Sequence, residues 1–300
     1  MQVSTLDQLV TCAQSLPSSR MAVVAAHDVQ VLRSVAQASE QGIATSVLIG
    51  DARQIEALAR DNALDLGDAA IEDQPDDARA AARAMALARE GQANIVVKGQ
   101  IKTAPFLRAA LDRQSGIRDK TLLSHVGVFQ APGLDRLFYM SDSGVVLYPA
   151  TMQKRVIIQN AVDAVRKLGI GEPRVAIVSA NEEVHPARPA GVEALVLARM
   201  AQEGWVSGAV VDGPMPLDVA LFPHIAAVKS VRGPVAGHAD ILIVPNVEVG
   251  NIAAKAIQYI GNGEMAGLVV GARVPILINS RADDAVTRLR SVAMAALVGR

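Results

Sequence analysis

The feature that most constrains the fold is a repeated alternation of short apolar runs with segments of helical periodicity. Residues 21–26 (MAVVAA) and 45–49 (TSVLI) are apolar runs, and residues 29–40 between them carry apolar side chains at helical spacing. The same order returns where residues 174–178 (RVAIV) precede a helical pattern over 192–202. Strands that alternate with helices in this way predict an α/β fold with mostly parallel sheets covered by helices.

Residues 121–148 interrupt this alternation. They contain short strand-like pieces with little helical periodicity, so we expect antiparallel hairpins there. The chain has 300 residues, and a domain usually holds roughly 150, so two domains or one large α/β domain are expected. Because no low-complexity linker separates the halves, we expect the chain to be ordered where it passes from one domain to the other.

Composition excludes several classes of protein. The formal net charge of −1 argues against a nucleic-acid partner, because binding to the phosphate backbone needs a basic excess. The single cysteine, Cys12, cannot form an intramolecular disulfide, which suits a reducing cytoplasm. Residues 1–16 lack the pattern of a signal peptide, and no apolar run reaches the length of about 20 residues that crosses a membrane. We therefore expect a cytoplasmic protein with neither a membrane nor a nucleic-acid partner.

Metal and nucleotide motifs are missing from the sequence. No Gly-x-Gly-x-x-Gly loop, Walker A loop or Gly-x-Ser-x-Gly elbow occurs, which disfavours hydride transfer, P-loop and serine-hydrolase chemistry. The histidines have no His-x-x-x-His spacing and no cysteine partner, so no metal site is predicted. They are His27, His125, His185, His224 and His238.

Polar residues follow the last predicted strand, residues 275–278, and precede the final helix. Ser280 and Asp283 have the spacing of a capping box, which explains both residues as well as a ligand does. Capping does not explain Arg281, because a cation at the positive end of a helix is favourable only when an anion binds there. Asp284 is not needed by this cap, and a carboxylate beside a phosphate site can act as a general base.

A second candidate segment runs from the end of an apolar strand into a helix that is predicted to start near Thr103. Lys98 and Gly99 form the turn, and Lys102 and Arg108 add positive charge. Cations at a helix start can hold phosphate. A solvated basic helix start explains the same residues slightly better, so both interpretations stay open.

The remaining candidates have ordinary structural explanations. A lone histidine such as His125, beside Ser124 in an apolar strand, is more often a satisfied core residue than a ligand-binding one. Residues 212–214 (Asp-Gly-Pro) are predicted to form a turn after a strand. Asn251 is a candidate helix cap. Lys255 follows one turn later, and its side chain is expected either to contact a phosphate or to face water.

Several longer segments carry a resemblance to a known family. These segments are VVAAHDVQVLRSVAQASEQGIATSVLIGD, VVKGQIKTAPFLRAAL, LLSHVGVF, FYMSDSGVVLYP with the segment up to SANEEVHP, VAGHADILIVP, EVGNIAAK and the most specific one, MAGLVVGARVPILINSRADD. Through them the chain resembles the phosphate acetyl/butyryl-transferase family along nearly its whole length, and it is more similar to the butyryl-type branch.

The resemblance implies a fold and an assembly. It implies the two-domain α/β fold of the isocitrate/isopropylmalate dehydrogenases, with the active site in the interdomain cleft. The first domain would hold residues 1–122 and 269–300, and the second residues 123–268. It also implies a homodimer or a higher homo-oligomer.

The resemblance further implies reversible transfer of a short acyl group, acetyl to butyryl, between coenzyme A and phosphate. No metal or cofactor is implied, since coenzyme A is a substrate. An aspartate would deprotonate the thiol, whose reference pKa of about 8.5 leaves it mostly protonated at neutral pH. Ser280 and Arg281 fall on the phosphate-binding positions and Asp284 on the base. Because the chain is shorter here than the acetyl-type pattern, Asp283 remains possible as the base.

The expected contacts to substrate extend beyond this segment. The residues that we predict to bind substrate are Lys98, Gly99, Thr103, Arg108, Ser124, His125, Asp142, Asn251 and Lys255.

Two positions depart from the family pattern. Gln258 or Tyr259 stands where acetyl-type members have an arginine, and Val219 stands where an asparagine is expected in a cleft loop. The alternative is therefore a degenerate acyl-CoA or acyl-phosphate binding protein without turnover. A dehydrogenase on the related fold would need metal-binding or nucleotide-binding features that the sequence lacks.

Overall fold

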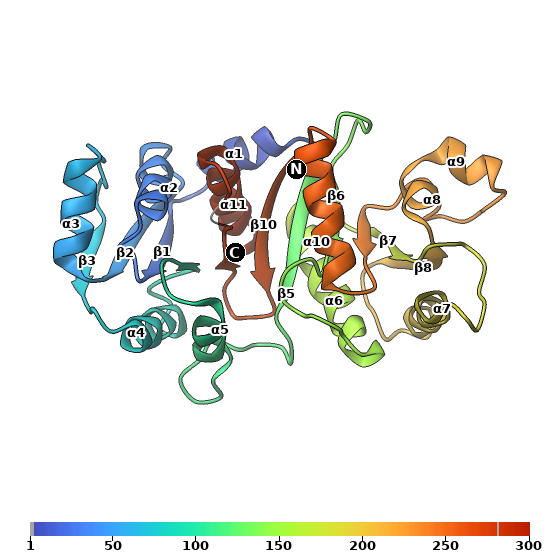
Figure 1. Cartoon of the computed structure of the whole chain (residues 1–300), viewed down its shortest axis with the longest axis horizontal. Helices are drawn as coiled ribbons and strands as arrows, with labels where there is room; N and C mark the ends of the chain where they lie inside the picture. Colours follow the sequence, from blue (N-terminus) through green and yellow to red (C-terminus); the bar gives the residue numbers. More distant parts are fainter. Residues whose placement is uncertain (1–2, 281) are drawn as a thin grey trace. The chain divides into compact units, whose positions relative to one another are not determined.

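The computed structural model describes residues 3–280 and 282–300, and the chain within it forms two compact units (Figure 1). The N-terminal unit contains Leu6–Thr121 and Ala266–Arg300. The middle unit contains Leu122–Met265 and the described start of the chain up to Thr5. The predicted domain bounds stay a prediction, since contacts within a unit do not show that it folds alone. No helix in the described part of the chain is long and apolar enough to cross a membrane.

The sheet of the N-terminal unit has the order β3-β2-β1-β4-β11-β10. Its neighbouring strands are parallel except β10 and β11, which pair antiparallel. The predicted strand over 21–26 stops earlier, at Val24, because Ala25 adopts a positive φ of 50° and turns the chain. The strands are β1 (Ser19–Val24), β2 (Ala44–Gly50), β3 (Ala70–Asp73), β4 (Ile95–Lys98), β10 (Glu264–Val270) and β11 (Ile276–Leu277).

Helices cover both faces of this sheet. Helices α1, α2 and α11 pack together, and α4 packs with α5 on the other side of the strands (Figure 1). Aspartates at the N-caps explain where two helices begin: Asp28 accepts from two backbone N–H groups of α2, and Asp76 accepts from one of α4. The helices are α1 (Leu6–Gln14), α2 (Val29–Glu40), α3 (Ala52–Asp61), α4 (Asp77–Arg89), α5 (Thr103–Leu111) and α11 (Ala285–Val298).

The sheet of the middle unit has the order β5-β6-β9-β7-β8. Strands β5 and β6 pair antiparallel, which confirms the hairpin predicted for residues 121–148, and the other neighbours are parallel. The predicted fold class, α/β with mostly parallel sheets, is confirmed. The strands are β5 (Ser124–Gln130), β6 (Phe138–Ser141), β7 (Arg174–Val178), β8 (Val210–Met215) and β9 (Ile241–Ile243).

Helices α6 and α7 pack against each other, and α8 packs with α9 (Figure 1). Helix α8 begins at Leu217, directly after Pro216. The helices of this unit are α6 (Thr151–Lys167), α7 (Pro189–Gln202), α8 (Leu217–Leu221), α9 (Pro223–Val228), α10 (Val247–Lys255) and the π-helical turn η1 (Ala256–Ile260).

The predicted turn at residues 212–214 is wrong, because these residues lie inside β8. The pairing of β7 with β8 shifts register there, so residues 212–214 form a bulge within a strand that continues beyond them. A Cβ at Gly213 would lie 2.8 Å from the carbonyl oxygen of Ile177, so the close approach of the two strands requires glycine.

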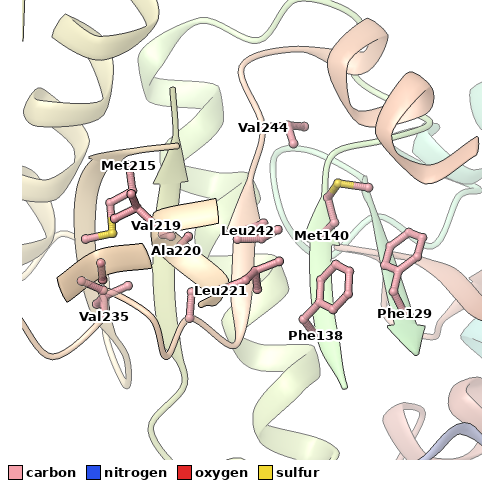
Figure 2. Close-up of a cluster of buried hydrophobic side chains, with 14 of the residues drawn as sticks. Phe129, Phe138, Met140, Met215, Val219, Ala220, Leu221, Val235, Leu242 and Val244 are labelled. Carbon is pink, nitrogen blue, oxygen red and sulfur yellow. The ribbon is translucent and has the colours of Figure 1, made fainter. Parts of the chain in front are cut away.

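The core of the middle unit is an apolar cluster that includes Phe129 and Phe138, whose stacked rings lie 5.4 Å apart (Figure 2). Val219 belongs to this cluster and is fully buried among Met215 and Leu242. The expectation that Val219 removes a polar group from a cleft loop is therefore wrong. Packing in the core explains its apolar side chain.

Candidate active site

The segment between β11 and α11 forms a tight turn that starts at Ser280. The backbone N–H of Ser280 donates to Oδ2 of Asp283 at 2.7 Å, and the N–H of Asp283 donates to the carbonyl of Ser280 at 3.2 Å. The N–H of Ala282 donates to the Ser280 hydroxyl at 3.3 Å. Arg281, the predicted phosphate ligand, lies outside the described residues. The turn thus presents a hydroxyl and a carboxylate at the carboxyl end of β11.

The predicted cap of α11 is wrong in its position. Ser280 is not the N-cap, since the helix begins at Ala285 and Asp284 caps it by accepting from the N–H of Thr287 at 2.8 Å. The Asp283 carboxylate instead accepts the Ser280 N–H within the preceding turn. The reason is that the chain completes the turn at Ser280 before it enters the helix. Asp284, which the sequence left without a structural role, has one.

The ionisation of Asp284 follows from this cap. The pKa of its carboxyl is lowered, first by the backbone hydrogen bond from Thr287. Partial burial raises the pKa, and the Thr287 side chain and the charge of Arg290 lower it further. The exposed carboxylate is therefore ionised at neutral pH and available to accept a proton.

Sequence reasoning missed Arg288. Its guanidinium donates from Nη2 to the carbonyl of Ser280 at 2.7 Å and from Nε to the carbonyl of Asp283 at 3.1 Å. The residue is only 5 % exposed. An arginine in the first turns of a mostly apolar final helix was the only sequence indication of this contact.

The turn at Lys98 and Gly99 follows β4. A Cβ at Gly99 would lie 2.3 Å from the carbonyl oxygen of Ala25 and 2.4 Å from that of Val24, so only glycine fits there. The Lys98 ammonium donates to the Gly99 carbonyl at 3.1 Å. Helix α5 starts at Thr103, as predicted, without a side-chain cap. Close packing thus explains Gly99 without a ligand.

Arg108 and Lys102 line one cavity of about 520 Å³ between α4 and α5. Both side chains are exposed, and Gln100 adds a neutral polar group to the lining. Asp77 and Asp112 line the same cavity, so its charge is mixed. This cavity brings together Lys102 and Arg108, two of the cationic residues singled out in the segment from Lys98 to Arg108.

In the middle unit, Ser124 is fully buried, and its hydroxyl accepts from Nδ2 of Asn160 at 3.0 Å. His125 is half-buried, and its Nδ1 lies 2.9 Å from the hydroxyl of Ser143. Both residues therefore have the protein partners expected of core polar groups.

Asp142 is 3 % exposed, and backbone groups occupy both of its carboxylate oxygens. Oδ1 accepts from the N–H groups of Gly144 at 2.8 Å and Val145 at 2.9 Å. Oδ2 accepts from those of His125 at 3.1 Å and Val146 at 3.2 Å. This carboxylate fixes the loop after β6 to the start of β5.

Asn251 is not the cap of its helix, contrary to the prediction. Asn246 is the N-cap of α10 and accepts from the N–H of Val249 at 3.0 Å, because the helix starts directly after the turn at Pro245. Asn251 is exposed on the helix. The ammonium of Lys255 lies 5.9 Å from the ring centroid of the exposed Tyr259.

Glycine at position 250 lets α10 approach the Asp142 loop. A Cβ at Gly250 would lie 2.8 Å from the Asp142 carbonyl oxygen and 2.8 Å from Cα of Ser143. The structure thus brings His125, Asp142 and the first turn of α10 together. Within the residues that the structure describes, no group of three His, Cys, Asp or Glu side chains gathers as a metal site requires.

Comparisons with known proteins agree with the motifs. The family described as phosphate acetyl/butaryl transferase matches residues 76–296. A phosphate butyryltransferase of Clostridium acetobutylicum is 36% identical over 99% of this chain and 98% of its own. A phosphate acetyltransferase of Rhizobium meliloti is 39% identical over 99% of this chain and 94% of its own.

A solved structure agrees as well. The crystal structure of a branched-chain phosphotransacylase from Enterococcus faecalis V583 superposes with a TM-score of 0.83 and 27% identity, over 94% of this chain and 99% of that chain. The resemblance drawn from the motifs, including the butyryl-type branch, is confirmed. The chain belongs to the phosphate acetyl/butaryl transferase family of enzymes.

Proposed function

We propose that the protein is a phosphate acyltransferase that moves a short acyl group, acetyl to butyryl, between coenzyme A and phosphate. The reaction is acyl-CoA + phosphate = acyl phosphate + CoA. The observation that carries this proposal is the turn before α11, which joins Ser280 to the carboxylate of Asp283 and leads directly into Asp284, the cap of the helix. Relatives named phosphate butyryltransferase and phosphate acetyltransferase, 36% and 39% identical, support it.

The geometry supports the following chemistry. Asp284 takes the proton of the CoA thiol, and the thiolate attacks the acyl carbonyl of the acyl phosphate. The bond from the acyl carbon to the phosphate oxygen breaks, and phosphate leaves. Ser280 and the N-terminus of α11 supply a hydroxyl and a positive dipole for the phosphate. We assign Arg281 to the phosphate as well, by its position next to Ser280 in the sequence.

Asp284 is the better of the two candidate bases. It is exposed, whereas Asp283 is half-buried and holds the Ser280 N–H through Oδ2. The lowered pKa of Asp284 keeps it ionised and ready to accept a proton. Asp283 stays the second candidate because it belongs to the same turn.

We assign the phosphates of coenzyme A to the cavity lined by Arg108 and Lys102, where two exposed cations face one space. Substrate contacts at Lys98, Gly99 and Thr103, and at His125, Asn251 and Lys255, remain proposals. So do a homo-oligomer, a cytoplasmic location, an active site in an interdomain cleft and a reaction without a cofactor. For Ser124 and Asp142, the bonds described above favour a structural role.

The test is release of CoA from acetyl-, propionyl-, butyryl- and longer acyl-CoA, with and without phosphate. Asp284→Asn is the informative variant because asparagine caps a helix about as well as aspartate, so α11 stays intact while the base is lost. Loss of a general base lowers the rate by about 10²- to 10⁴-fold. Asp283→Asn is the matched variant in the same turn, and a loss confined to it would move the base to Asp283.

The acyl donor that is turned over fastest would define the substrate. Absence of phosphate-dependent release from every acyl-CoA would overturn the proposal. Binding of acyl-CoA without release would then indicate the binding protein considered from the sequence.

A further inference from the structure

Arg288 is a buried cation in an unusual electrostatic setting. It is 5 % exposed, and no carboxylate forms an ion pair with it among the described residues. It lies close to the N-terminus of α11, where the helix dipole disfavours a positive charge. Burial of a charge costs free energy unless hydrogen bonds compensate it. An apolar side chain would fill the same space without that cost, so packing alone does not explain an arginine.

Among the described residues, the hydrogen bonds that compensate this charge come from the turn that carries the candidate catalytic groups. The guanidinium fork donates to the carbonyls of Ser280 and Asp283, the two residues that close the turn on each other. The Ser280 carbonyl accepts from both Arg288 at 2.7 Å and the Asp283 N–H at 3.2 Å. Arg288 therefore connects both ends of the turn to one rigid helix.

That helix is a firm support. Helix α11 packs against α1 and α2, and Ser291, one turn after Arg288, is buried and accepts from the N–H of Gly267 at 3.1 Å. Asp284 caps the same helix. The positions of the Ser280 hydroxyl and of both carboxylates are thus set relative to α11 by two links, the Asp284 cap and the Arg288 fork.

We propose that Arg288 is a positioning residue for acyl transfer, which holds the Ser280–Asp283 turn so that the hydroxyl and the base meet the substrate in reactive geometry. The inference rests on the proposed function of this turn. Reacting groups must be held within a fraction of an ångström, and a displacement of about 1 Å can cost roughly 100-fold in rate. Arg288 itself acts through the turn and not on the substrate.

The test compares Arg288→Lys with Arg290→Lys. Lysine keeps the charge at position 288 but is a single ammonium that cannot reproduce the fork to two carbonyls. Arg290 is the matched control because it is 7 % exposed in the same helix and its guanidinium pairs with Asp7, while lysine keeps the charge that lowers the pKa of Asp284. The assays are run at pH 8, where Asp284 is ionised with or without the nearby Arg290 charge.

The expected result is a fall in kcat of about 10- to 100-fold for Arg288→Lys, with the KM values for acyl-CoA and phosphate close to wild type. Arg290→Lys should keep kcat, whatever it does to stability. In Arg288→Ala, low and non-denaturing concentrations of guanidinium chloride should restore part of the rate. The free guanidinium ion can occupy the space left by the side chain and donate to the same two carbonyls. A purely structural loss would not be restored in this way.

Hydrogen exchange separates this inference from the proposed function. The N–H groups of Ala282 and Asp283, both bonded to Ser280, should exchange faster in Arg288→Lys than in wild type or Arg290→Lys. If wild type shows no phosphate-dependent release, the proposed function fails, and unchanged exchange would in addition show that Arg288 does not order the turn. If wild type is active and Arg288→Lys keeps both kcat and slow exchange, the inference alone is overturned.

Discussion

Replacing Asp142 with asparagine is a sharp test of whether this residue organises a loop or binds substrate. The change is isosteric; it replaces one acceptor oxygen with an NH₂ group and removes the negative charge. Oδ1 and Oδ2 each receive two backbone N–H groups. Whichever way the amide is turned, its NH₂ group faces two N–H donors, and both lose their acceptor.

The expected loss of stability follows from the two N–H donors that lose their acceptor. A buried donor left without an acceptor costs about 1–3 kcal/mol, so two of them predict a loss of about 2–6 kcal/mol in the free energy of unfolding of the middle unit. Stability of a whole domain is only about 5–15 kcal/mol, so the effect is large. The affected donors are the N–H groups of either Gly144 and Val145 or His125 and Val146.

Urea unfolding followed by tryptophan fluorescence measures this loss, because the single tryptophan, Trp205, lies in the middle unit. Asn246→Asp is the matched control in the same unit: Asn246 accepts one N–H at the start of α10, where aspartate caps equally well. A loss below about 1 kcal/mol for Asp142→Asn would refute the reasoning. Unchanged stability with a raised KM would instead support the substrate contact predicted from the sequence.

Three further predictions address other contacts. Gly250→Ala should destabilise the middle unit by about 1–3 kcal/mol through overpacking against the Asp142 loop, whereas Gly171→Ala, with nothing within 4 Å, should be nearly neutral in the same urea assay. Glu193→Gln should cost about 3–5 kcal/mol, because it removes the ion-pair partner of the buried Lys154 ammonium, and the same Trp205 assay measures it. The pKa of Asp284 is lowered from its ordinary value of 3.8, so its stabilising contribution is complete above pH 3.8 and is lost as pH falls through the folded-state pKa. Acid unfolding of Asp284→Asn should lack that part of the pH dependence, and an unchanged acid profile would contradict the capping role.

Periodicity was sufficient for much of the fold. The helical pattern over 29–40 gave the bounds of α2, and the structure adds Asp28 as the N-cap at its start. The loss of helical periodicity at residues 121–148 indicated the β5–β6 hairpin. Both features depend on local sequence, which a single chain displays.

The failures share a different physical origin. Ser280 and Asp284 are both suitable caps for α11, and Asn246 and Asn251 for α10, so the pattern alone does not choose between them. The choice depends on contacts distant in sequence, such as the close approach of α10 to the Asp142 loop at Gly250. The role of Arg288 likewise appears only once the turn has folded back onto the helix.

The cap and the proposed base place opposite demands on Asp284. The bond from Thr287 and the dipole of α11 favour the carboxylate, and they therefore disfavour the protonated acid that forms when the thiol gives up its proton. A base of lowered pKa cannot hold a proton from a thiol of reference pKa about 8.5 for long, so the proton must pass on to solvent, which the exposure of Asp284 permits. The carboxylate is ionised throughout the neutral range. It follows that, with acyl phosphate and CoA as the substrates, a rise of kcat/KM between pH 7 and 9 reports ionisation of the CoA thiol, while titration of Asp284 would appear only in acid.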